Sequence, residues 1–205
     1  MKNYESMTDE TLALQYVGGD NRAFDELLAR NQKRLYDYIL FVVHDPELAN
    51  DVFQDTFIKA ITNLQEGKYN VIGKFSFWLY RIAHNVIMDT FRMQKNEHVI
   101  EATPGNDLSK LKSEAVMDIN RENEYVNSQV LRDVRHMMDR LPTPQREVVY
   151  MRFYQELSFK EIAEVTGVSI NTSLGRMRYA LINLRRMAKE HEILASITAT
   201  RSFPK

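Results

Sequence analysis

SFKEIAEVTGVSINTSLGRMRYALINLRRMAK, residues 158–189, is the stretch of sequence that decides how the C-terminal part of this chain folds. Ser158 and Glu161 form a capping box, in which the hydroxyl and the carboxylate satisfy each other's backbone N–H groups. The short helix that they open is expected to stop at Gly167, because glycine tolerates the left-handed conformation of a helix C-terminus. A longer helix follows, so the stretch has the pattern of a helix-turn-helix.

The second helix of this stretch is predicted to begin at a cap formed by Ser169 or Asn171 and to reach about Lys189. Ala163 in the first helix is small enough to let the second helix cross closely. The helical spacing predicts that the second helix buries an apolar stripe consisting of Leu174, Met177, Leu181, Leu184 and Ala188.

Basic side chains occupy positions off this stripe, and no acidic residue lies between Val165 and Lys189. The basic residues are Arg176, Arg178, Arg185, Arg186 and Lys189. A solvated face of a bundle helix is the alternative interpretation, but such faces usually mix Glu with Lys. We therefore favour a helix that enters the major groove of DNA.

Helical periodicity also dominates the rest of the chain, and 7 Gly and 5 Pro in 205 residues are few for a many-stranded fold. Apolar spacing predicts further helices over about 21–42, 46–64, 75–95, 125–141 and 144–156. Asp45-Pro46 is typical of a helix start, and Thr143-Pro144 is expected to cap the last of these helices.

The predicted fold class is all-α, with two small helical domains joined by a flexible acidic linker and a C-terminal helix-turn-helix. Residues 97–124 lose the apolar density of their neighbours and contain seven acids. The predicted boundaries are 1–96 for the N-terminal domain, 97–127 for the linker, 128–190 for the C-terminal domain and 191–205 for a tail.

The formal net charge of −1 taken alone argues against nucleic-acid binding, but the charges are segregated along the chain. Residues 1–64 carry a balance of −5 and residues 97–124 one of −4, whereas 65–96 and 159–190 each carry +3. Scatter on a solvated surface is the alternative. The segregation favours two phosphate-facing patches, with the acidic surfaces left for another partner.

Several function classes are disfavoured by what the sequence lacks. The chain has no Cys, and therefore no disulfide scaffold, thiolate metal site or cysteine nucleophile. We find no Gly-rich phosphate loop, metal-ligand spacing or nucleophile–base pair, so we expect no cofactor, no metal and no enzymatic activity. Without a long apolar run or a secretory signal, we expect a cytoplasmic protein that does not insert into a membrane.

Two of the predicted N-terminal helices, those over 46–64 and 75–95, each carry a distinctive face. On the helix over 46–64, Asp51, Gln54, Asp55 and Ile58 share one side, and Phe53, Phe57, Ala60 and Leu64 form another. The helix over 75–95 interleaves aromatic residues with Arg81, Arg92 and Lys95, a combination that suits stacking and phosphate contacts with single-stranded nucleic acid. Core packing is the alternative role for the aromatics, and the one that we expect for Trp78.

Three segments, ELANDVFQDTFIKA (47–60), FWLYRIAHNVIMDTFR (77–92) and LPTPQREVVYMRFYQELSFKEIAEVTGVSINT (141–172), resemble sigma factors of bacterial RNA polymerase. The resemblance covers nearly all of residues 8–190 in the expected order and spacing. The short linker points to the extracytoplasmic-function (ECF) group. Such a protein is expected to bind core RNA polymerase and promoter DNA, and to be controlled by an anti-sigma factor.

The resemblance also implies roles for individual residues. The polymerase clamp would be contacted by Asp51, Gln54, Asp55 and Ile58. The minus-ten element, read as melted single strand, would be contacted by Tyr80, Arg81, Asn85, Asp89 and Arg92, with a flipped base held by the loop 67–73. The minus-thirty-five element would be contacted by Asn171, Thr172, Ser173, Gly175, Arg176, Arg178 and Tyr179. The linker would thread the polymerase channels.

One turn departs from the pattern of the family, because many members carry a basic residue at the position of Leu174, Ser at Gly175 and Arg at Tyr179. Base-reading roles therefore do not transfer directly to this turn, where Arg178 is our candidate for a base edge. The alternative function is an autonomous helix-turn-helix regulator with a sensory or dimerising N-terminal domain. Such regulators read duplex DNA and do not need the aromatic-basic helix.

Overall fold

A computed structural model describes residues 3–69, 74–100 and 134–201 of the chain, which divides into two compact units, Met1–Met117 and Asp118–Lys205. Every regular element in those described ranges is helical, which confirms the all-α fold class. No described helix is both long and apolar enough to cross a membrane. Most of the predicted linker, including any short helix within it, lies outside the described residues, so its boundaries stay a prediction.

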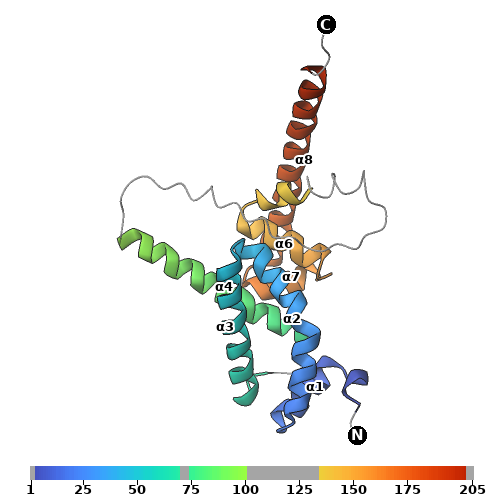
Figure 1. Ribbon diagram of the computed structural model, residues 1–205, viewed down its shortest axis with the longest axis vertical. Helices are drawn as coiled ribbons and strands as arrows, with labels where there is room; N and C mark the ends of the chain where they lie inside the picture. Colours follow the sequence, from blue (N-terminus) through green and yellow to red (C-terminus); the bar gives the residue numbers. More distant parts are fainter. Residues whose placement is uncertain (1–2, 70–73, 101–133, 202–205) are drawn as a thin grey trace. The chain divides into compact units, whose positions relative to one another are not determined.

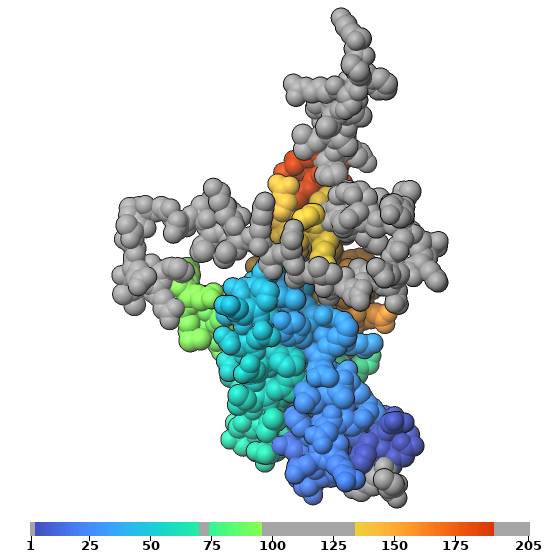
Figure 2. Space-filling view, viewed as in Figure 1, coloured from blue at the N-terminus to red at the C-terminus, as the bar shows by residue number. Residues whose placement is uncertain are grey.

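The first unit is a helical bundle (Figure 1) built from η1 (Tyr4–Ser6), α1 (Asp9–Val17), α2 (Asn21–Val43), α3 (Pro46–Gln65) and α4 (Phe75–Ile100). Asp45 caps α3 as predicted, since its Oδ1 accepts hydrogen bonds from the N–H groups of Glu47 (2.9 Å) and Leu48 (3.2 Å). In the space-filling view, the atoms of α2 and α3 lie against one another on the face that is shown (Figure 2).

The helix α1 was not predicted from the sequence, because its nine residues bury only Leu12 and Ala13. Contacts from α2 hold it in place. The Arg30 guanidinium donates to the carbonyls of Tyr4 (2.8 Å) and Met7 (2.7 Å) and pairs with Asp9. These contacts satisfy the charged guanidinium and fasten the N-terminal segment to α2.

The core of the first unit lies where α2, α3 and α4 meet. Tyr38 of α2 and Tyr80 of α4 are both buried and pack edge to face, with ring centroids 5.2 Å apart. Leu64 of α3 and Ile87 of α4 are fully buried. This packing sets the rotation of α4 about its own axis and so determines which of its side chains face outward.

The second unit contains residues 134–139 as a helical segment, followed by α6 (Thr143–Phe153), α7 (Phe159–Thr166) and α8 (Ile170–Arg201). The predicted capping box is present, with Ser158 N–H donating to Glu161 (2.7 Å) and Glu161 N–H to Ser158 Oγ (3.3 Å). Gly167 adopts φ 65°, and Ser169 rather than Asn171 caps α8. The helix-turn-helix is therefore confirmed.

Three predicted helix limits in this unit are wrong. Thr143 lies inside α6 and caps nothing, because the Pro142 carbonyl already accepts the first helical hydrogen bonds, from Gln145 and Arg146. The helix ends at Phe153 instead of residue 156, since Glu156 takes a left-handed conformation with φ 56°. At the other end of the unit, α8 continues past Lys189 to Arg201, into the predicted tail.

The predicted apolar stripe of α8 is also wrong in part. The buried side chains of this helix among residues 170–190 are Ser173, Met177, Ala180 and Met187, with Leu184 half-buried. Leu174 and Leu181 are exposed, Leu174 by 43%. The predicted stripe and the observed buried residues both recur every three or four positions, and they share Met177 and Leu184. The small side chains of Ser173 and Ala180 let α8 approach the rest of the unit closely. The helix therefore buries these two residues and leaves Leu174 and Leu181 exposed.

The buried residues of α8, Ser173, Met177, Ala180 and Met187, form its buried seam. We expect Met177→Ala to lower the local free energy of unfolding of the second unit by about 2–5 kcal/mol, because it opens a cavity in this seam. Leu174→Ala, one turn away on the exposed edge, should change it by less than about 1 kcal/mol. Hydrogen exchange of peptides from residues 143–190, read by mass spectrometry, measures both. Equal losses for the two variants would contradict the seam described above.

Candidate nucleic-acid interface

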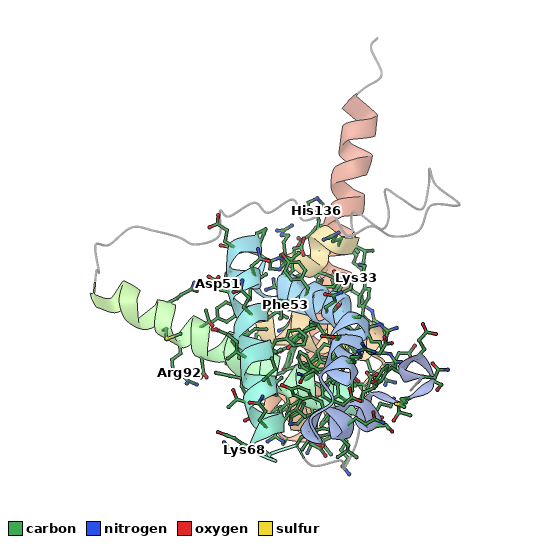
Figure 3. The ribbon with its side chains drawn as sticks, turned by 60° about the horizontal axis from the view of Figure 1, so that its bottom comes forward. Lys33, Asp51, Phe53, Lys68, Arg92 and His136 are labelled. Carbon is green, nitrogen blue, oxygen red and sulfur yellow. The ribbon has the colours of Figure 1, made fainter. Side chains whose placement is uncertain are left out.

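One side of α4 carries the polar residues that the sequence placed against single-stranded DNA. Arg81, Asn85 and Arg92 are all exposed, and their spacing of four and seven residues puts them on one helical face. Figure 3 shows Arg92 projecting away from the helix. We call these three residues the α4 surface.

Asp89 lies at the margin of the α4 surface and is held by two cations. Its carboxylate pairs with Arg92 of the same helix at 3.0 Å and with Lys59 of α3 at 3.9 Å. All three side chains are about half exposed or more, so these ion pairs contribute little to stability. A phosphate group could therefore replace Asp89 beside Arg92 at small cost.

Tyr80, which was also predicted to contact DNA, is buried in the core: only 4% of the residue is exposed and its ring packs on Tyr38. Sequence reasoning could not separate it from Arg81, since adjacent helical positions differ by one step of rotation that only packing resolves. Of the other aromatic residues, Phe75 is buried as well. Those with partly exposed rings on this helix are Phe77, Trp78 and Phe91.

The start of α4 rests on an aromatic cluster. The rings of Tyr69, Phe75 and Trp78 contact one another with centroids 4.9–5.7 Å apart, which agrees with the structural role expected for Trp78. Burial, together with the charges of Glu10 and Asp9, raises the pKa of Tyr69 to about 12, so its phenol stays protonated at neutral pH. Residues 70–73 of the loop expected to hold a flipped base lie outside the described residues.

The outer face of α3 is acidic and polar. Asp51, Gln54, Asp55 and Ile58 are all exposed, with Ile58 at 61%, and their spacing places them on one side of the helix. We call these four residues the α3 surface. The α3 surface therefore combines two exposed carboxylates with one exposed isoleucine, which follows Asp55 by one turn.

The inner side of α3 matches the second face predicted from the sequence only in part. Ala60 and Leu64 are buried, but Phe53 and Phe57 are half-buried and form an edge-to-face series with Tyr36 of α2. The buried seam runs instead through Ala49, Val52 and Thr56.

The exposed part of α8 includes most of the residues predicted to contact duplex DNA. Asn171, Thr172, Arg178 and Tyr179 are exposed, and Gly175 and Arg176 are half-exposed. We call these six residues the α8 surface. The Thr172 hydroxyl lies 2.9 Å from Ser169 Oγ, so this end of the surface includes the cap of α8.

Ser173, which was also predicted to contact DNA, is fully buried where α8 packs on the rest of the second unit. Sequence reasoning also missed Leu174 and Ile182, which are 43% and 46% exposed beside the α8 surface. The signal that could have located them is the pair of small residues at 173 and 180, which marks the edge of close helix packing.

Comparisons with known proteins identify the family of this chain. The family descriptions "Sigma-70 region 2" and "Sigma-70, region 4" match residues 27–97 and 131–174. RNA polymerase sigma-H factor of Pseudomonas aeruginosa is 30% identical over 178 residues, which cover 82% of this chain and 88% of that protein. ECF RNA polymerase sigma factor SigW of Bacillus subtilis is 26% identical over 86% of this chain and 94% of its own length.

Two solved structures share the fold. The sigma factor RpoE of Bartonella quintana, in complex with the anti-sigma factor NepR, superposes with a TM-score of 0.62 at 20% identity, covering 81% of this chain and 96% of that chain. CnrH, in complex with the cytosolic domain of CnrY, gives 0.61 at 25% identity over 89% of this chain and 97% of that chain.

The fold is all-helical with a C-terminal helix-turn-helix, and the matches to known sigma factors span both units. Together these findings define a promoter-recognition factor. The chain belongs to the sigma-70 family of RNA polymerase sigma factors, in its ECF group. It directs the polymerase to promoters in transcription initiation. Similarity along both units disfavours the alternative of an autonomous regulator with an unrelated N-terminal domain.

We expect Ser173→Ala to leave binding to duplex promoter DNA by the holoenzyme unchanged. The free energy of unfolding of the second unit should stay the same or rise by about 1 kcal/mol, because Ser173 Oγ has no hydrogen-bond partner among the described residues. The control is Ser169→Ala, which removes the cap of α8 and should cost about 1 kcal/mol. Filter binding measures the affinity for duplex DNA, and chemical denaturation measures the free energy of unfolding. Weaker DNA binding by Ser173→Ala at unchanged stability would assign Ser173 to the α8 surface.

Proposed function

We propose that this sigma factor uses three separate surfaces in promoter recognition. The α3 surface binds the clamp of core RNA polymerase. The α4 surface, with Asp89 at its margin, reads the minus-ten element as melted single strand. The α8 surface reads the minus-thirty-five element as duplex through the helix-turn-helix.

The observation that carries this proposal is the separation of charge between faces. None of the four residues of the α3 surface is basic, and Lys59, the exposed cation that follows it, pairs with Asp89 of α4, so the α3 surface would repel phosphates and favour a basic protein partner. The α4 and α8 surfaces present arginine, asparagine and threonine side chains, which donate hydrogen bonds to phosphates and base edges. A chain of net charge −1 can therefore act on DNA once its acidic face is covered.

The α8 surface divides further by position along the helix. Arg178 lies about two turns from the Ser169 cap, where a recognition helix meets base edges, and it is exposed. Arg185 is exposed two turns further on, where it would reach the DNA backbone or the polymerase. We assign base reading to Arg178 and a phosphate contact to Arg185.

We also infer an anti-sigma factor among the partners. The RpoE relative named above was crystallised with the anti-sigma factor NepR, and such a protein would inhibit this chain by covering the α3 surface or the α8 surface. The protein itself has no catalytic step in this proposal, because RNA synthesis is carried out by the polymerase. Its place of action is the cytoplasm, where the polymerase works.

The α3 surface is tested by the double variant Asp51→Arg/Asp55→Arg. Because both side chains are exposed, the variant should fold normally, and charge reversal should abolish pull-down of core polymerase. The matched control is Asp25→Arg/Glu66→Arg, which reverses two exposed acids outside the α3 surface and should bind normally. A folded Asp51/Asp55 variant with unchanged pull-down would refute this surface.

The role of Arg178 is tested in a two-by-two transcription assay with wild-type and altered minus-thirty-five elements. A bidentate Arg–guanine contact supplies about 1–3 kcal/mol of discrimination, so Arg178→Ala should lower transcription only from the wild-type element. Arg185→Ala should weaken both templates alike and lower the salt slope of binding by about one. Equal loss on both templates for Arg178→Ala would make Arg178 a phosphate contact.

A further inference from the structure

The N-terminus of α4 is capped by a residue from another helix. The first intrahelical hydrogen bonds run from Phe77 N–H (3.1 Å) and Trp78 N–H (3.4 Å) to the carbonyl of Lys74, so Lys74 occupies the N-cap position. An ammonium group has no acceptor, and Lys74 therefore cannot satisfy the free N–H groups of the first turn. The first of these, the Phe75 N–H, donates to Glu10 Oε1 of α1 at 2.8 Å.

The Glu10 carboxylate suits this position electrostatically. Burial alone would raise the pKa of Glu10, but hydrogen bonds from the N–H of Phe75 and from its own N–H, the Thr8 hydroxyl and the nearby charge of Lys74 lower it overall. The carboxylate is therefore ionised at neutral pH. A negative charge at a helix N-terminus is also stabilised by the dipole of the helix.

Glu10 is itself held in place from α2. Its neighbour Asp9 pairs with Arg30 at 3.2 Å and accepts a hydrogen bond from Asn31 at 2.9 Å. A chain of polar contacts thus runs from α2 through the first turn of α1 to the first turn of α4. It joins segments about 65 residues apart in sequence, from Glu10 to Phe75.

The first turn of α4 lies directly before the α4 surface. Phe75 and Trp78 pack on each other and on Tyr69, and Arg81 follows Trp78 by less than one turn. Because a helix is stiff over this distance, a change in where α4 begins moves Arg81 and Asn85 together.

We propose that Glu10 is a positioning residue for the α4 surface, holding the start of α4 so that Arg81 and Asn85 meet the melted minus-ten strand. The inference rests on the proposed function of the α4 surface. Glu10 does not touch DNA in this proposal and acts only through the hydrogen bond to Phe75.

The experiment uses holoenzyme reconstituted with full-length wild type, Glu10→Ala, Glu10→Gln or the control Glu5→Ala, which removes an exposed carboxylate from η1. Two affinities are measured at a temperature where every variant is folded: for a single-stranded minus-ten oligonucleotide and for a duplex minus-thirty-five fragment. Glu10→Ala should weaken single-strand binding by about tenfold, the size expected when a hydrogen bond to a charged group is lost. Duplex binding should not change.

Glu10→Gln keeps an acceptor oxygen for the Phe75 N–H and should recover most of the single-strand affinity, which assigns the effect of Glu10→Ala to this hydrogen bond. The unchanged duplex binding at a temperature where every variant is folded separates positioning from a loss of fold stability. Arg81→Ala and Asn85→Ala are run in parallel. If they weaken single-strand binding and Glu10→Ala does not, the positioning inference fails and the proposed function stands. If neither of them weakens it, the proposed α4 surface fails, and the inference fails with it.

Discussion

The face that each long helix buries is the constraint on which the rest of this structure depends. On α4, the edge-to-face contact between Tyr38 and Tyr80 fixes the rotation of the helix and leaves Arg81 and Asn85 outside. On α8, burial of Ser173 and Met177 has the same effect for Arg178. One step of helical rotation is enough to exchange a core residue for a surface residue, so the candidate contacts follow from the packing.

In the proposed function, separation of charge lets a nearly neutral chain serve two kinds of partner. The exposed acids of α3 favour a protein partner, and the exposed arginines and amides of α4 and α8 favour nucleic acid. The same separation should hold promoter binding in check until the polymerase covers the acidic face. Ion pairs at the margin, such as Asp89 with Arg92, are weak enough to be replaced by phosphate contacts.

Tertiary hydrogen bonds complete what local sequence leaves unfinished. The cap of α7 is local, because Ser158 and Glu161 are three residues apart, and it was predicted correctly. The cap of α4 comes from Glu10 on another helix, and no window of neighbouring residues contains that information. The short helix α1 is likewise held by Arg30 of α2, which explains why periodicity did not reveal it.

The sequence by itself determined the helical class, the helix-turn-helix with Gly167 at its turn, the cap of α3 at Asp45 and the exposed acidic face of that helix. These features depend on residues within a few positions of one another, where spacing and capping chemistry decide the outcome. Only the tertiary structure decided that Tyr80 and Ser173 are buried, that Leu174 is exposed, and that Pro142 displaces Thr143 from the cap of α6. Two apolar edges of equal spacing compete on an amphipathic helix, and the choice between them depends on the shape of the helices that pack against it.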